Sequence, residues 1–469
     1  MNHNKVLKAG VGYTIGNVLV KGISFLTLPL FSRLMTTEEF GVYNVFISYE
    51  SILFVIIGLA IHTSMRSAKL EFPGKIDEYT SSVSLIYLVN LTFFGFVILF
   101  FGKQISSLIN FSEAVLVMLV LYSFGSAVLT LYNHRISLDY AYKKYLIIAL
   151  INTVGNIGLS LFLILTVFSQ KRDIGRITGA TVSLTALSVV LLLQFYKLAR
   201  PKYNPAYWKF AIKYSLPIVP HGISQVLLAQ FDRIAIRSMV GDAAAGIYSL
   251  AGNIKLVLTI ITESISTAWT TWFYEEFHTG NREKIQDNAK KLCGLFCLFS
   301  VILIFISPEL IHLLGGIEYI DGRYVAVPMI IDAFLLFVYN IVVTAEYYYK
   351  KTIFVMLGTI VAAVINLITN LIFIKKYGYI AAAYTTLFAY VIYLILHLTI
   401  SRKLSGFFIL RLKFLFLYSS LIILSAVLDL IFVEKLWLRL IFCVSIAAPL
   451  AAWLAKISGI MMTIKKKIS

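Results

Sequence analysis

The sequence predicts an all-α integral membrane protein with about fourteen transmembrane helices. Of its 469 residues, 59% are hydrophobic and only 14% are charged, and the mean hydropathy is +0.86. Soluble domains average roughly 45–50% apolar and about 25% charged residues. Apolar windows of the length that crosses a bilayer, about 20 residues, recur along the whole chain. The connectors between them are short, so a soluble enzyme is excluded.

The predicted spans fall into three groups by charge. Five carry no charged residue, namely 79–102, 145–170, 177–196, 352–374 and 377–401. Five contain one or more charges, namely 9–31, 40–65, 211–239, 246–272 and 324–349. Four complete the set, namely 114–133, 292–308, 414–432 and 438–459. Proline bends are expected in the first and seventh spans, at Pro29, Pro217 and Pro220.

The chain repeats itself at an offset near 205 residues. Gly-Val-Tyr at 41–43 recurs as Gly-Ile-Tyr at 246–248, and DYAYKK at 139–144 recurs as EYYYKK at 346–351. Internal repeats are typical of transporters built from two related halves around a central site. We therefore predict two six-helix lobes, 1–200 and 201–403, around a central cavity, followed by an additional helix pair and basic tail at 404–469. Because each lobe has an even number of helices, both lobes begin on the same side of the membrane, and the repeat is parallel rather than inverted.

The net charge of +18 reflects membrane orientation rather than a nucleic-acid partner. With a cytoplasmic N-terminus, 27 of the 41 Lys and Arg fall in cytoplasmic segments and 11 in outer loops. This asymmetry predicts that both termini are cytoplasmic and that the protein is a multi-pass protein of the cytoplasmic (inner) membrane. Lys171, Arg172 and Arg176 are the worst misfit, since they fall on the outer side.

The charged residues inside the spans are the first candidates for a site. Such residues are costly in a bilayer and usually face a bundle interior or a wet cavity. Lys21, Arg233 and Lys255 would supply cationic sites for an anionic head group. Glu50, Glu263 and Asp332 could bind a coupling proton or cation. The alternative for each is an ion pair that holds helices together.

Uncharged polar residues on the same helices could hydrogen-bond sugar hydroxyls. Interhelical hydrogen bonding is the equal alternative for each. They are Asn17, Asn44, Gln225, Gln230 and Asn253.

Sequence motifs for catalysis and metal binding are missing. No phosphate-binding P-loop, HExxH, GxSxG or DxD occurs, which excludes ATP hydrolysis within this chain. Cys293, Cys297 and Cys443 lie inside apolar runs and give neither a disulfide framework nor a zinc spacing. The longest polar connector, 273–291, is too short for a catalytic domain. We expect no enzyme activity, no metal and no cofactor other than a proton or sodium gradient.

Several motifs together resemble the bacterial polysaccharide flippases, the O-antigen and capsule exporters of the multidrug/oligosaccharidyl-lipid/polysaccharide superfamily. The resemblance covers about residues 8–400. The first motif is LTLPLFSRL at 26–34 followed by EFGVY at 39–43, and the second is GL at 58–59 followed by Met65-Arg66. The third consists of LP at 216–217, Asp232-Arg233 and GIY at 246–248. The fourth consists of Asn366, Asn370, YG at 377–378 and AAA at 381–383. The chain departs from the family pattern at Glu50 and at Ala243-Ala244-Ala245.

The resemblance implies a V-shaped bundle of two lobes with a cationic cavity lined by spans 1, 2, 7 and 8. It implies translocation of a polyprenyl-pyrophosphate-linked oligosaccharide by alternating access. The expected partners are then the bilayer, the lipid-linked oligosaccharide and other polysaccharide-assembly proteins, with the chain acting as a monomer.

Three alternatives stay open at this point. A drug or cation exporter of the same superfamily would need an acidic cavity, and the mixed intramembrane charges do not exclude it. A flippase for the peptidoglycan lipid precursor is not separated from an O-antigen or capsule flippase by composition. A membrane-embedded glycan polymerase or ligase would be an enzyme, and it would be expected to need a large outer loop.

Overall fold

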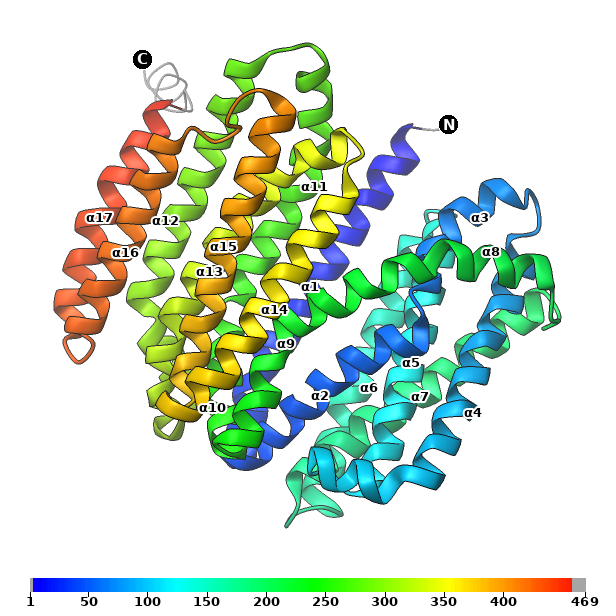
Figure 1. Cartoon of the computed structure of the whole chain (residues 1–469). Coiled ribbons are helices and arrows are strands. Elements are labelled where there is room, and N and C mark those ends of the chain that lie inside the picture. The colour runs from blue at the N-terminus through cyan, green and yellow to red at the C-terminus, as the bar shows by residue number, and fades with distance from the viewer. Residues whose placement is uncertain (1–2, 458–469) are drawn as a thin grey trace. The chain divides into compact units, whose positions relative to one another are not determined.

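Helices form throughout residues 3–457, which are the part of the chain that the computed structural model describes (Figure 1). Within these residues there is no β-strand. The α-helices are α1 (His3–Leu34), α2 (Thr37–Gly58), α3 (Met65–Glu71), α4 (Ile76–Ile109), α5 (Glu113–Ser137), α6 (Tyr142–Thr166), α7 (Arg172–Leu198), α8 (Pro205–Ser215), α9 (Val219–Met239), α10 (Asp242–Ile254), α11 (Leu256–His278), α12 (Arg282–Gly315), α13 (Arg323–Tyr348), α14 (Thr352–Tyr377), α15 (Tyr379–Ser405), α16 (Leu412–Ile431) and α17 (Leu436–Ile457). Three short 3-10 helices are η1 (Ile61–Ser64), η2 (Leu216–Ile218) and η3 (Ile317–Gly322).

The membrane character of the fold is confirmed. Among the described residues, 11 helices are long and apolar enough to cross a membrane, or 12 if the bent pair α10–α11 is one span. Two further predicted spans coincide with α1 and with α8–α9, which do not meet that criterion. Charged and polar side chains such as Lys21, Asp232 and Arg233 make these helices less apolar. The count of fourteen spans therefore stays a prediction.

Three predicted spans are interrupted. The span at 40–65 ends at Gly58, because Leu59 and Ala60 have φ of +45° and +51° and turn the chain into η1. The span at 211–239 divides at η2, which contains Pro217; proline has no N–H to continue the helical hydrogen bonding. The span at 246–272 breaks at Lys255, between α10 and α11.

By packing, the chain divides into two units, Met1–Gly246 and Ile247–Ser469. In the first unit α2 packs on α5, α7 and α9, and α6 packs on α1 and α7. The units differ from the lobes predicted at residues 200 and 403, because α9 packs on α2 in the first unit. Those boundaries follow the internal repeat and stay a prediction.

The glycines of the two repeated Gly-aliphatic-Tyr motifs meet in the first unit. A Cβ atom on Gly41 would overlap the carbonyl oxygen of Asp242, and a Cβ atom on Gly246 would overlap the carbonyl oxygen of Thr37. The first turns of α2 and α10 therefore touch backbone to backbone. Only glycine allows this approach, because it has no Cβ.

The second unit is organised around α13, the most buried of its candidate spans. Helices α11, α12, α14 and α15 pack on α13, and the additional pair α16–α17 packs on α12 (Figure 1). Arg439 of α17 holds this pair in place. Its buried guanidinium donates to the carbonyl oxygen of Phe305 at 2.7 Å and pairs with Glu309 of α12.

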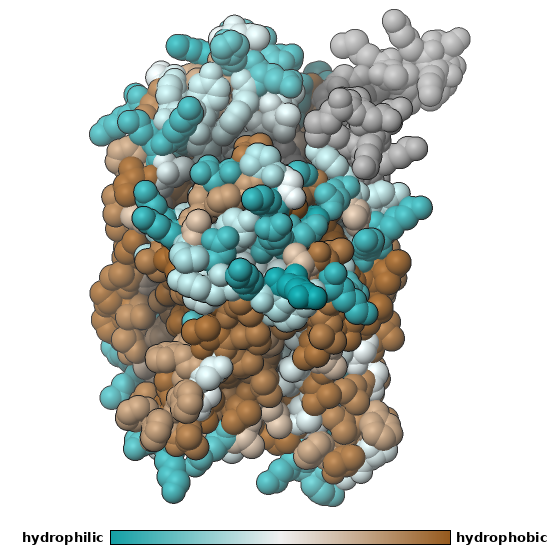
Figure 2. All heavy atoms as spheres, turned by 90° about the vertical axis from the view of Figure 1, so that its right-hand side faces the viewer, coloured by the Kyte–Doolittle hydropathy of each residue, from teal (hydrophilic) through white to brown (hydrophobic). Residues whose placement is uncertain are grey.

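The surface agrees with a lipid environment. Figure 2 shows hydrophobic side chains covering much of the lower part of one face, with hydrophilic side chains gathered above them and at the lower rim. Long stretches of exposed Leu, Ile, Val and Phe occur on α4, α6, α14 and α16. A soluble protein would rarely expose such continuous apolar surface. The protein is a multi-pass membrane protein.

Candidate functional site

The interruption between α10 and α11 places Lys255 at a bend of 42°. Lys255 precedes Leu256, the first residue of α11, and its carbonyl oxygen accepts from the amide and hydroxyl of Thr259 at 3.0 and 3.1 Å. Discontinuous membrane helices expose backbone groups and are where transporters build substrate sites. The break therefore marks a candidate binding site within the second unit.

Asp332 of α13 is the counter-ion of this lysine. The Nζ atom of Lys255 lies 3.3 and 3.4 Å from the two carboxylate oxygens of Asp332. The Lys255 side chain is 31% exposed, whereas that of Asp332 is 3% exposed. An ammonium group has three donor hydrogens. Those that do not face the Asp332 carboxylate point in other directions. The structure thus joins a predicted cationic residue to a predicted coupling acid.

Arg233 belongs to a polar chain in the first unit. Its guanidinium donates to the Oε1 atom of Gln230 at 2.5 Å and to the carbonyl oxygen of Ala229 at 3.3 Å. The same Oε1 atom accepts from the hydroxyl of Ser48 on α2 at 3.4 Å. Neighbouring Asp232 is buried. This chain links α9 to α2, as the interhelical interpretation of Gln230 predicts.

Lys21 lies on α1 in the first unit and is partly buried. Asn17, one turn earlier, has a side chain outside the described part of the structure. Lys21 and Arg233 belong to the first unit, and Lys255 belongs to the second.

The two remaining candidate acids have opposite environments. Glu50 on α2 is buried, and its carboxylate is hydrogen-bonded to the hydroxyl of Ser126 on α5. Its backbone carbonyl accepts from Ser123 at 3.5 Å. Glu50 therefore faces the interior of the first unit. Glu263 on α11 is exposed.

The other candidate sugar ligands bond locally or are exposed. Asn44 donates to the carbonyl oxygen of Phe40 at 2.8 Å, and Asn253 donates to that of Ser249 at 2.9 Å, each within its own helix. These bonds leave the amide oxygens as acceptors. Gln225 on α9 is exposed.

Two of the three basic residues that did not fit the orientation rule, Arg172 and Arg176, are partly buried and contact other helices. Arg176 donates to Asn156 at 2.5 Å and to Ser160 at 2.6 Å, and it lies 3.9 Å from the ring centroid of Phe31. Arg172 donates to the carbonyl oxygen of Leu34, at the end of α1. These cations bind other helices and are not loose loop charges.

Sequence reasoning missed a buried acid–base pair in the second unit. The Nδ1 atom of His397 lies 2.7 Å from the Oε1 atom of Glu346, and both side chains are fully buried. Tyr339 and Tyr393 pack against the imidazole, with ring centroids 4.9 and 4.7 Å away. Counting histidine with the charged residues would have marked the window 377–401 as polar. No cluster of metal-ligating side chains occurs in the described residues.

A multi-pass helical fold with a broken helix is typical of membrane transporters. The comparison with solved structures agrees on the fold. The structure resembles the lipid II flippase MurJ in an inward closed conformation with a TM-score of 0.76, at 14% sequence identity, over 95% of this chain and 98% of that one.

The sequence comparisons identify the family. The model of the polysaccharide biosynthesis protein family matches residues 6–275, more than half of the chain, and the protein belongs to this family. A relative from Haloferax volcanii, named "Probable low-salt glycan biosynthesis flippase Agl15", is 21% identical over 83% of this chain and 82% of its own. The capsular polysaccharide biosynthesis protein CapF of Staphylococcus aureus is 22% identical over 79% of this chain and 93% of its own.

Proposed function

We propose that this protein is a flippase that moves polyprenyl-pyrophosphate-linked oligosaccharide repeat units across the cytoplasmic membrane by alternating access, for O-antigen, capsule or a related surface polysaccharide. The observation that carries the proposal is the half-buried ammonium of Lys255 at a broken helix, in a member of the polysaccharide biosynthesis family. The process is transport and not an enzymatic reaction.

Lys255 would bind the pyrophosphate of the substrate. A phosphate oxygen can accept from those ammonium hydrogens that do not face Asp332. Because Asp332 is buried and pairs with Lys255, it fixes the position of the lysine ammonium group. Lys21 and Arg233 are the further cations that we assign to the pyrophosphate.

The amide groups assigned to the glycan are those of Asn17, Asn44, Gln225 and Asn253. The amide oxygens of Asn44 and Asn253 can accept from sugar hydroxyls while their nitrogens stay bonded to the helix backbone. Weak, numerous contacts of this kind suit a substrate that must also be released.

A carboxylate that takes up and releases a proton or sodium ion would couple transport to an ion gradient. We assign this role to Glu50, Glu263 or Asp332. Burial of Glu50 beside Ser126 and of Asp332 beside Lys255 supports these two most. The protein would work as a monomer in the inner membrane with both termini cytoplasmic.

The experiment is mass spectrometry of lipid extracts from cells depleted of the protein. We expect one polyprenyl-pyrophosphate-linked oligosaccharide to accumulate while surface glycan is lost, because the repeat unit is made on the inner face and is not delivered. The accumulated lipid identifies the substrate. An unchanged lipid-linked pool together with new drug sensitivity would instead support an exporter and overturn the proposal.

Rescue of the depleted cells tests the cationic residues. The double variant Lys21→Gln with Lys255→Gln should fail to restore surface glycan at normal protein level. Lys284→Gln is the matched control, because Lys284 is 51% exposed and pairs with Glu276 at the surface. Full rescue by the double variant would remove both lysines from the site.

A further inference from the structure

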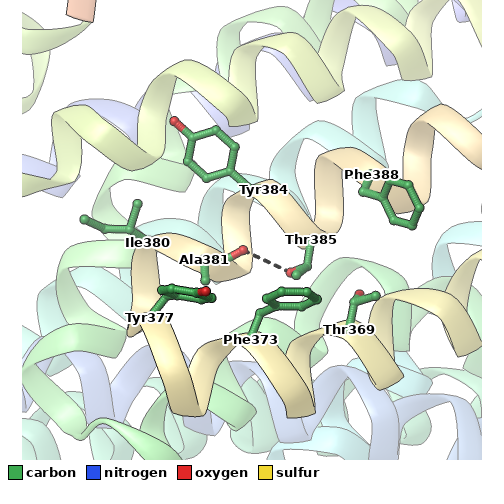
Figure 3. Close-up of a pocket in the computed structure, with 8 residues that line it drawn as sticks. All are labelled: Thr369, Phe373, Tyr377, Ile380, Ala381, Tyr384, Thr385 and Phe388. Carbon is green, nitrogen blue, oxygen red and sulfur yellow. Dashed lines mark hydrogen bonds between the residues drawn. The ribbon is translucent and has the colours of Figure 1, made fainter.

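A cavity of about 640 Å³ lies between α14 and α15 in the second unit. Figure 3 shows the side chains that line it, which come from both helices. The lining residues are Thr369, Phe373 and Tyr377 of α14, and Ile380, Ala381, Tyr384, Thr385 and Phe388 of α15. None of them belongs to the site assigned above. We call this cavity the α14–α15 groove.

The walls of the groove are aromatic and open to the outside. The rings of Phe373 and Tyr377 stack with their centroids 6.1 Å apart and their planes at 16°. Tyr384 and Phe388 are 47% and 51% exposed on the opposite helix. In a membrane such rings contact hydrocarbon, so a lipid chain is the natural occupant of the space between them.

Buried polar contacts behind the groove hold its two helices together. The Nδ2 atom of Asn366 donates to the hydroxyl of Thr386 at 2.8 Å, and that of Asn370 donates to the Oδ1 atom of Asn366 at 3.2 Å. Asn370 in turn accepts from Thr385. Side-chain hydrogen bonds of this kind join membrane helices. The groove is therefore a preformed feature, and it uses motif residues to which the proposed function gives no role.

Two lysines stand at one end of the groove. Lys375 and Lys376 are exposed in the last turn of α14. The Nζ atom of Lys376 lies 5.0 Å from the ring centroid of Tyr377. Lys376 follows Phe373 by three residues and Thr369 by seven, which places all three on one helical face. A cationic end on an apolar groove matches an anionic head group on a hydrocarbon chain.

The groove has the length of one bilayer leaflet. From Thr369 to Tyr377 the helix rises about 12 Å, at 1.5 Å per residue. Half of the hydrocarbon core is about 15 Å. A phospholipid acyl chain reaches from the head-group level to the midplane, whereas a polyprenyl chain of a carrier lipid is much longer.

We propose that the α14–α15 groove is a binding site for one anionic phospholipid of the bilayer. One acyl chain lies between the rings of Phe373, Tyr377, Tyr384 and Phe388, and the phosphate lies at Lys376, while Lys375 adds positive charge from the other side of the same helical turn. The site is distinct from the substrate site assigned to Lys255 and does not depend on it.

The test is native mass spectrometry of the purified full chain titrated with phosphatidylglycerol or phosphatidylcholine of identical acyl chains. We expect phosphatidylglycerol to bind with the higher affinity. Lys375→Gln with Lys376→Gln should weaken phosphatidylglycerol binding about thirtyfold, since each lysine near an anionic surface contributes roughly 1 kcal/mol. The control is Lys350→Gln with Lys351→Gln, an exposed pair at the other end of α14.

A second variant tests the groove itself. Ala381→Phe fills the space between the helices and should abolish the tightest phosphatidylglycerol binding. Val364→Phe adds the same ring at an α14 position that is 50% exposed and outside the groove, and it should change nothing. Equal affinity for the two lipids, or equal loss from both lysine pairs, would overturn the proposal. So would displacement of phosphatidylglycerol by an equimolar polyprenyl phosphate.

Discussion

The side chains of Glu346 and His397 depend on each other, because both are fully buried and 2.7 Å apart. Removing one partner of a buried pair typically costs about 3–5 kcal/mol. We predict that Glu346→Ala lowers the thermal unfolding temperature of the purified protein strongly. Glu346→Gln should lower it much less, since the amide oxygen can still accept from the imidazole.

The control is the double variant Glu346→Ala with His397→Ala. Two residues in direct contact should show non-additive effects, because the second substitution removes a group that the first has left unpaired. If the loss of stability in the double variant equals the sum of the losses in Glu346→Ala and His397→Ala, the interaction between the two side chains does not stabilise the bundle.

His62, in η1 outside the candidate spans, should give the protein an acid-sensitive stability. Burial, reinforced by the neighbouring His134, lowers the pKa of His62 from 6.5 to about 4. The unfolded chain therefore takes up a proton as the pH falls below 6.5, while the folded protein does not. Stability present above pH 6.5 is lost between about 6.5 and 4.

The measurement is the unfolding temperature of wild type and His62→Phe across this pH range. Phenylalanine keeps the ring beside Phe54, whose centroid lies 6.1 Å from that of His62, but it cannot titrate. The variant should lose less stability in acid than the wild type. Parallel curves would show that His62 contributes nothing to the pH dependence.

Single residues were predictable from sequence where hydropathy alone exposes them. Lys255 and Asp332 stand out because charge is costly in an apolar span, although their pairing needs the packing of α11 and α13. Arg176 was assigned to a loop because it lies at the edge of its span, and only the fold shows that it turns inward to Asn156.

At the scale of helices, the first turn of α2 crosses residues 242–246 of the first unit so closely that no space is left for side chains at Gly41 and Gly246. We predict that Gly41→Ala destabilises the protein by about 1–3 kcal/mol, the usual range for overpacking. The unfolding temperature measures this. Gly95→Ala is the matched control, because nothing lies within 4 Å of a Cβ built there in α4. An equal effect of both variants would exclude the crossing as the cause.

Helix breaks were predictable only where proline causes them. Pro217 lies in η2 as expected for a residue that cannot donate a backbone hydrogen bond. The break at Lys255 and the left-handed residues Leu59 and Ala60 have no such signature, because ordinary residues adopt these conformations only when the packing around them compensates. The break at Lys255, which marks the candidate site, was therefore not predictable from its apolar window.

At the scale of the whole molecule, the orientation in the membrane is open to a direct test. The native cysteines Cys293, Cys297 and Cys443 are buried, so thiols added at the surface should dominate labelling by an impermeant maleimide. We predict that Lys171→Cys is labelled in intact cells, whereas Glu283→Cys is labelled only after permeabilisation. Both positions are exposed. The reverse pattern would invert the predicted topology.

The membrane class and the helical architecture followed from composition, since bilayer thickness fixes helix length. The division into packing units did not, because the repeat in the sequence and the contacts in space have different boundaries. Helix α9 continues the second repeat but packs on α2. The hydrophobic periodicity of the sequence does not indicate which neighbouring helix a polar helix packs against.

The contact between Gly41 and Gly246 also limits how this gene can diverge. The two glycines are corresponding positions of the sequence repeat, and a Cβ on either one would overlap a backbone carbonyl in the segment that holds the other. Neither copy can gain a methyl group there unless the crossing opens. We therefore expect both copies of the repeated motif to keep glycine at this position.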